Sequence, residues 1–250
     1  HGTFNTPGPI VAGVLLIQFG LVDSMRIIYV LVTVLYLIAA IWRLRLKETV
    51  ANGDPEPIKV RYFISSYPKA VKESLHVWKV LPPTVFWLFI VQTLVMFGMS
   101  MTGVMNAIYA REVLGIPEEQ WWLTFIPLLL SMIVMSIPIG KMVDKIGRKT
   151  PMALGLIVFA SATLIFSVGN LIIVMIAMSM FATGQLLVMS SVMALSTDLI
   201  DPANRGKVVG FRNFVGYIFN GLGMLLGNYL YITFFPQLPF YVTLAMIIPA

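Results

Sequence analysis

Gly140-Lys141-Met142-Val143-Asp144-Lys145-Ile146-Gly147-Arg148-Lys149 is a polar segment that separates two long apolar stretches. Residues 121–139 before it carry no charge, and no charged residue occurs between Lys149 and Asp198 after it. Apolar segments of about 20 residues are long enough to cross the hydrocarbon core of a bilayer. The pattern therefore predicts a loop at a membrane surface that joins two transmembrane helices.

The composition of the whole chain agrees with a membrane environment. Hydrophobic residues make up 58% of the 250 residues and charged residues only 11%, whereas soluble domains carry roughly 25% charged residues. The net charge of +6 is confined to alternate loops, which favours an orientation signal over nucleic-acid binding. With Cys 0 and His 2, disulfides and thiolate metal sites are excluded. We expect no metal and no cofactor.

The positions of charged residues predict about eight transmembrane helices, because an unpaired charge at mid-bilayer costs at least about 2.5 kcal/mol. The first residue is His1, and Gly8-Pro9 already lies inside an apolar run. We therefore expect a fragment whose first and last helices are truncated. The predicted spans cover residues 3–21, 27–42, 83–110, 121–139, two segments divided near 167–170, 213–234 and a segment starting at 238.

Basic residues alternate from loop to loop. The segments 43–79, 140–149 and 198–212 are rich in Lys and Arg, whereas the loop after residue 110 has Arg111 against three glutamates and the turns at 169 and 236 have no basic residue. Lys and Arg are enriched in cytoplasmic loops. This alternation predicts an integral protein of the cytoplasmic (inner) membrane, with residues 43–82 in the cytoplasm.

Residues 43–82 form the one extended polar segment. Residues 52–57 read Asn-Gly-Asp-Pro-Glu-Pro and interrupt any helix. Beyond them Val71, Leu75 and Trp78 recur at helical spacing, which indicates an amphipathic helix on the inner leaflet. A solvated connector helix is the alternative, and in either case the segment joins two halves of the molecule.

Several of these segments resemble the major facilitator superfamily. Residues 140–149 are similar to its signature loop G-x-x-x-D-x-x-G-R-[RK], and 198–206 to the loop between its tenth and eleventh helices. Residues 45–49 resemble the end of its sixth helix and 111–116 the loop after its seventh. The resemblance implies helices five to twelve: the last two helices of the N-terminal half in 1–42, a linker in 43–82, and the C-terminal six-helix half in 83–250, with its last helix incomplete.

The resemblance also implies a conformational latch that closes the cytoplasmic side in the outward-open state. Arg148 can form a charge-assisted pair with Asp144 or with Asp198, whereas lysines such as Lys149 can simply keep the loop in the cytoplasm. We assign seven residues to the latch: Gly140, Asp144, Gly147, Arg148, Lys149, Asp198 and Arg205.

Two groups of small residues indicate close helix packing or a hinge. Gly8, Pro9 and Gly13 are similar to the fifth-helix element G-P-x-x-G-G of proton-coupled drug antiporters, from which Ala12 and Phe4 depart. Proline removes a backbone donor and kinks a helix. Gly223 and Gly227 have the G-x-x-x-G spacing of a membrane-helix packing face.

Polar side chains inside predicted spans are candidates for the transport path, because facing lipid would be costly for them. Gln92, Met99 and Asn106 lie about two turns apart and are expected on one helix face. The alternative for each is an interhelical hydrogen bond, worth about 0.6 kcal/mol. The candidates are Gln92, Asn106, Tyr109, Gln185, Asn213 and Asn220.

Together these features predict a secondary active transporter that moves a small solute by alternating access, as a proton-coupled multidrug efflux antiporter for hydrophobic compounds. The alternatives are uptake or facilitated transport of a sugar or another neutral metabolite, and a non-transporting scaffold or receptor. An enzyme is not expected, because no His, Asp or Glu lies well inside a span to activate a nucleophile such as Ser100. The expected partners of the monomer are lipid, a small-molecule substrate and protons, with the proton carrier outside this segment.

The loop alternation can be tested by cysteine labelling of the full-length protein in intact cells. A cysteine replacing Glu118 should react with a membrane-impermeant thiol reagent from outside, and one replacing Asp54 only after permeabilisation. The opposite labelling pattern would contradict the predicted orientation.

Overall fold

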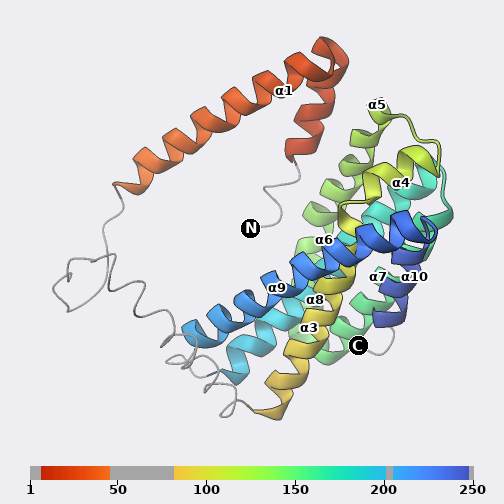
Figure 1. Ribbon diagram of the computed structural model, residues 1–250. Coiled ribbons are helices and arrows are strands. Elements are labelled where there is room, and N and C mark those ends of the chain that lie inside the picture. Colours follow the sequence, from red (N-terminus) through yellow and green to blue (C-terminus); the bar gives the residue numbers. More distant parts are fainter. Residues whose placement is uncertain (1–6, 46–81, 201–204, 248–250) are drawn as a thin grey trace.

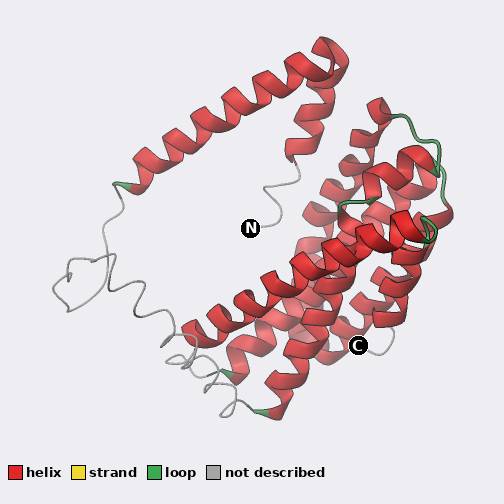
Figure 2. Cartoon of the chain, viewed as in Figure 1, coloured by secondary structure: helices red, strands yellow, loops and turns green. Residues whose placement is uncertain are grey.

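The computed structural model describes residues 7–45, 82–200 and 205–247, and the predicted linker helix around residues 71–78 lies outside them. The described residues form helices joined by short loops (Figures 1 and 2). The helices are α1 Pro7–Arg43, α3 Pro83–Gly103, α4 Asn106–Glu112, α5 Glu118–Trp121, η2 Trp122–Thr124, α6 Phe125–Ile146, α7 Lys149–Val168, α8 Leu171–Leu199, α9 Arg205–Thr233 and α10 Leu238–Ile247.

Five segments of the described chain are long and apolar enough to cross a membrane: Gly8–Arg43, Pro83–Gly103, Glu118–Ile146, Lys149–Val168 and Leu171–Leu199. Helix α9 is also 29 residues long, but its asparagines make it more polar, and the apolar α10 has 10 residues. The described parts of the predicted spans lie mostly on helices, with the first two spans on α1. The prediction of an all-α membrane protein is confirmed.

Two predicted boundaries are wrong, and the first lies in α1. The predicted spans 3–21 and 27–42 leave a gap in which Asp23 and Arg26 mark a short turn, yet these two residues are helical and form an ion pair of 3.3 Å along the helix surface. The break lies at Gly20, whose φ of 71° and ψ of 175° interrupt the helix. Glycine adopts this conformation without the steric penalty of a Cβ, so the backbone turns there.

The second wrong boundary is the single span predicted for residues 83–110. Helix α3 ends at Gly103, and a turn in which the Met105 amide donates to the Thr102 carbonyl at 3.0 Å precedes α4. Asn106 therefore begins a separate helix. Glycine is a poor helix former, and the separate α4 places Tyr109 in the core described next.

An aromatic cluster fills the core at the end of the bundle where α4, α7 and α10 meet. Tyr109, Phe166 and Phe240 are each at most 1% exposed, and the Tyr109 and Phe240 ring centroids lie 4.7 Å apart. The Tyr109 hydroxyl donates a hydrogen bond of 2.6 Å to the Ser167 carbonyl. Buried aromatic pairs of this kind contribute about 0.5–1.5 kcal/mol beyond area burial, so the cluster fixes α4 against α7 and α10.

Helices α3 and α9 pack through glycines. A Cβ added at Gly223 would lie 2.8 Å from the Phe97 carbonyl oxygen, and one at Gly227 would lie 2.7 Å from the Met101 Cα. Side-chain carbons do not normally approach backbone atoms so closely. The G-x-x-x-G spacing therefore lets the two backbones meet directly, as small residues do between membrane helices.

Helix α1 lies apart from the bundle that α3 to α10 form (Figure 1). Before Gly20, α1 contacts α5, η2 and α6. Gly13 packs directly on the Trp122 ring there. After Gly20 the helix extends away, and only 6% of its most apolar window is buried. The break at Gly20 thus separates a packed segment from an exposed one.

The α3–α9 contact can be tested with matched glycine variants. Gly227→Ala should lower the melting temperature of the full-length protein, because overpacking a tight contact costs about 1–3 kcal/mol. Gly221→Ala on the same helix is the control, since a Cβ there would meet nothing within 4 Å. Equal melting temperatures in detergent for the two variants would contradict the direct backbone contact.

Candidate latch and transport path

The central contact of the candidate latch joins α7 to α8. The chain turns at Gly147, whose φ of 89° favours glycine, and Arg148 follows immediately before α7. The Arg148 Nη2 lies 2.7 Å from the Asp198 Oδ2, and the two side chains are 40% and 49% exposed. Of the two partners considered from sequence, the structure places Asp198 at Arg148.

The position of Asp198 explains why a cation is needed there. Asp198 lies in the last turn of α8, where the helix dipole presents partial negative charge and destabilises an anion. The Arg148 guanidinium offsets this repulsion. Its Nε is buried without a hydrogen-bond partner among the described residues, so the pair leaves one donor unused.

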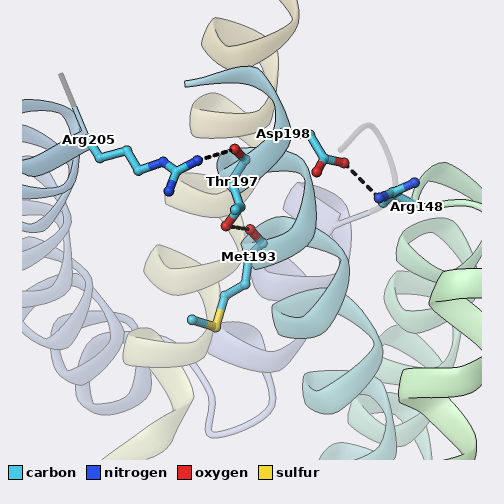
Figure 3. Close-up of polar contacts among 5 residues, drawn as sticks. All are labelled: Arg148, Met193, Thr197, Asp198 and Arg205. Carbon is cyan, nitrogen blue, oxygen red and sulfur yellow. Dashed lines mark hydrogen bonds and ion pairs between the residues drawn. The ribbon is translucent and has the colours of Figure 1, made fainter. Parts of the chain in front are cut away.

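Arg205 holds the same end of α8 from the other side (Figure 3). Its Nη2 donates to the Thr197 carbonyl at 2.7 Å and its Nε donates to the Ile200 carbonyl at 3.2 Å. The last carbonyls of a helix lack intrahelical partners, and Arg205 supplies donors to this end. Residues from α7 and α9 therefore meet at the end of α8.

The remaining predicted latch residues are not in this contact. Asp144 is exposed near the end of α6, and no ion pair or hydrogen bond joins its carboxylate to the described residues. Lys149 is exposed as the first residue of α7, and a Cβ at Gly140 would meet nothing within 4 Å. The structure thus brings together Arg148, Asp198 and Arg205, with Gly147 shaping the turn.

Polar contacts at the opposite end of the bundle were missed from sequence. The Tyr231 hydroxyl donates to the Glu112 Oε2 at 3.1 Å, which joins α9 to α4. Arg111 pairs with Glu118, which joins α4 to α5. The available signal was Tyr231 at the end of a long membrane helix, a position where tyrosines are enriched. The contact itself joins residues 119 positions apart.

The candidates for the transport path lie in different environments. Tyr109 is fully buried in the aromatic cluster and bonded to Ser167, so its interactions are those of packing. Gln92 is 8% exposed on α3, and Asn106 and Gln185 are half-buried. On α9, Asn220 is half-buried and Asn213 is exposed.

The hinge candidates in α1 all lie before the break at Gly20. Gly8 and Pro9 lie in the first turn of the described helix, and the break is at Gly20 instead. Gly13 serves close packing against Trp122, whereas a Cβ at Gly8 would meet nothing within 4 Å.

Comparison with known protein families matches residues 88–250, which is more than half of the chain, to the family model described as Major Facilitator Superfamily. None of the curated protein sequences compared with the chain is a significant match. The matched segment contains α6, α7, α8 and α9, and with them every residue of the latch contact.

The latch can be tested by exchanging its charges in the full-length protein. Asp198→Arg should impair transport by placing two cations together, and the double variant with Arg148→Asp should restore it in part. An exposed pair contributes about 0.2–1 kcal/mol, so Asp198→Asn should shift conformational occupancy by at most about fivefold. Lys149→Gln is the control; a double variant no better than Asp198→Arg would argue against the pair.

Proposed function

The chain belongs to the major facilitator superfamily of secondary transporters, and we propose that the protein moves a small uncharged solute by alternating access. In its specific form, the proposal is proton-coupled efflux of hydrophobic compounds. The contacts and charges that support this proposal lie in the α3–α10 bundle and at its two ends.

The observation that carries the proposal is the position of the charged side chains. Every acidic residue of the described chain lies near a helix end or the Gly20 break: Asp23, Glu112, Glu118, Glu119, Asp144 and Asp198. The described basic residues lie within about two turns of such positions. The middle of each described span in the α3–α10 bundle therefore offers no charge to compensate a charged solute, and desolvating such a solute without a partner is expensive.

Polar contacts at both ends support a two-state mechanism. The pair Arg148–Asp198 joins α7 to α8 at one end, and the bond from Tyr231 to Glu112 joins α9 to α4 at the other. Single contacts of this kind contribute on the order of a kcal/mol or less. Free-energy contributions of this size shift the equilibrium between two conformations, and both conformations remain populated.

The efflux assignment is supported by two features of the apolar surface. Gly13 packs on Trp122, within an element similar to that of drug antiporters. Exposed methionines on four helices of the bundle, Met135 of α6 among them, offer flexible, polarizable surface that adapts to varied apolar solutes. The others are Met96 on α3, Met189 and Met193 on α8, and Met224 on α9.

A second candidate, transport of a sugar or another neutral metabolite, is favoured by amide side chains within the spans. Gln92, Gln185 and Asn220 lie on three different helices. Amides both donate and accept hydrogen bonds without charge, which suits a hydroxylated neutral solute. A scaffold without transport activity would show no flux of either class.

Reconstitution of the full-length protein separates these possibilities. An imposed pH gradient should accelerate the movement of chloramphenicol, a neutral aromatic amide, whereas glucose and the cation tetraphenylphosphonium should move slowly. Fast glucose flux would favour the metabolite transporter, and absence of all flux would favour the scaffold. Empty liposomes are the control for passive leakage.

Neutralising the described acids tests where proton coupling resides. Variants such as Glu112→Gln and Asp144→Asn should retain the response to the pH gradient, because neither carboxylate lies mid-span, where coupling sites usually occur. A variant that loses the pH response but keeps solute counterflow would place the proton carrier on that residue. This result would contradict the expectation that the carrier lies elsewhere.

A further inference from the structure

A cavity of about 180 Å³ lies between α1 and the segment formed by α5 and η2, at the end of the bundle opposite the latch contact. The bend of α1 at Gly20 (Figure 1) lets both arms of this helix contribute to the wall, with Leu16 before the bend and Leu21 after it. Trp121 and Trp122 contribute from the other side. The wall is mostly apolar, and none of the transport-path candidates lines it.

Two polar groups in this wall are buried without a hydrogen-bond partner among the described residues. They are the Ser24 hydroxyl and the Trp122 indole N–H. Ser24 is only 2% exposed, although both of its neighbours in the chain are exposed. Buried polar side-chain atoms in proteins nearly always have a partner, either in the protein or in an ordered small molecule. The two groups therefore indicate a site where a small molecule supplies the missing partner.

The charges around the cavity are compensated within the protein. Glu118 is the one charged residue in the described part of the wall, and it pairs with Arg111. Asp23, which precedes Ser24 in the chain, pairs with Arg26 at 3.3 Å. A charged ligand would have to displace one of these partners or bury its charge unpaired, and unpaired burial is expensive. The surroundings therefore favour an uncharged ligand.

We propose that this cavity binds an uncharged molecule of about the size of one aromatic ring that carries a hydroxyl group. The Trp122 N–H can only donate a hydrogen bond, whereas the Ser24 hydroxyl can donate or accept one, and a ligand hydroxyl suits both. Aromatic rings attract one another in edge-to-face and offset arrangements, so Trp121 and Trp122 favour an aromatic body. An apolar cavity of about 150 Å³ holds benzene, and the present volume of about 180 Å³ leaves room for one small polar group.

The proposed site goes beyond the proposed transport function, because its ligand is not the transported solute. Helix α1 precedes residues 46–81, and α5 and η2 follow them. A ligand held between these two segments stabilises their contact. If it binds one conformation more tightly than another, it shifts the population toward that conformation. The site is therefore suited to regulation by a small molecule.

Binding of para-fluorobenzyl alcohol to the full-length protein in nanodiscs tests the site by fluorine NMR. Binding should be saturable, and Ser24→Ala and Trp122→Phe should each weaken it by about two- to tenfold, because each removes one hydrogen-bonding group. Ser136→Ala and Trp87→Phe, at exposed positions outside the cavity, are the matched controls and should bind like the unaltered protein. Absence of saturable binding, or equal affinities for all four variants, would overturn the proposal.

Two analogues of the same ring test the chemical class. para-Fluorotoluene lacks the hydroxyl and should bind about two- to tenfold more weakly than the alcohol, with no further loss in Ser24→Ala. para-Fluorobenzylammonium, a cation, should also bind more weakly than the alcohol. Empty nanodiscs control for partition into lipid. Equal affinity for the toluene would reduce the site to a nonspecific apolar void, and tighter binding of the cation would assign the ligand to Glu118; either result would overturn the proposed class.

The melting temperature without a ligand distinguishes a binding site from a structural bond. Ser24→Ala should melt at the same temperature as Ser136→Ala or higher, because it removes a buried hydroxyl that has no partner among the described residues. A lower melting temperature for Ser24→Ala would show that the hydroxyl holds a structural contact or a bound water, and would contradict the proposal. Binding and melting are measured without flux, so failure of the proposed transport function leaves both outcomes unaffected.

Discussion

Hydrocarbon cannot solvate charge or replace a lost hydrogen bond, and the arrangement of this chain follows from that constraint. The described charged residues are confined to the regions near helix ends and the Gly20 break. Because these residues lie in the same regions, side chains of opposite charge from different parts of the chain can form ion pairs. Arg148 and Asp198 pair at one end, and Arg111 and Glu118 pair at the other.

The two ends are held by different chemistry. At one end, arginines from α7 and α9 supply donors to the last turn of α8, where carbonyls and a carboxylate accumulate negative charge. At the other, a tyrosine and a glutamate connect α9 to α4 above an aromatic core. The buried aromatic core stabilises the packing of these helices. The exposed polar contacts are weak enough to exchange partners during a conformational change.

Helix α9 combines close helix packing, apolar surface and polar side chains in one element. Its glycines allow direct contact with α3, its apolar face suits lipid, and its asparagines would be costly in lipid. A helix with these faces is too polar to meet a simple hydropathy criterion for a membrane span, although it is as long as α8.

The sequence by itself determined the helical membrane class, most span positions and the family, because lipid imposes length and polarity on each segment separately. It also predicted a latch role for Arg148 but left the partner of this residue open between Asp144 and Asp198. Only the tertiary structure decided that pairing, the contact between Tyr231 and Glu112, and the burial of Tyr109. The breaks at Gly20 and Gly103 likewise followed from the folded structure. These features depend on which helices meet in space, and a pattern of residues along one chain does not record that.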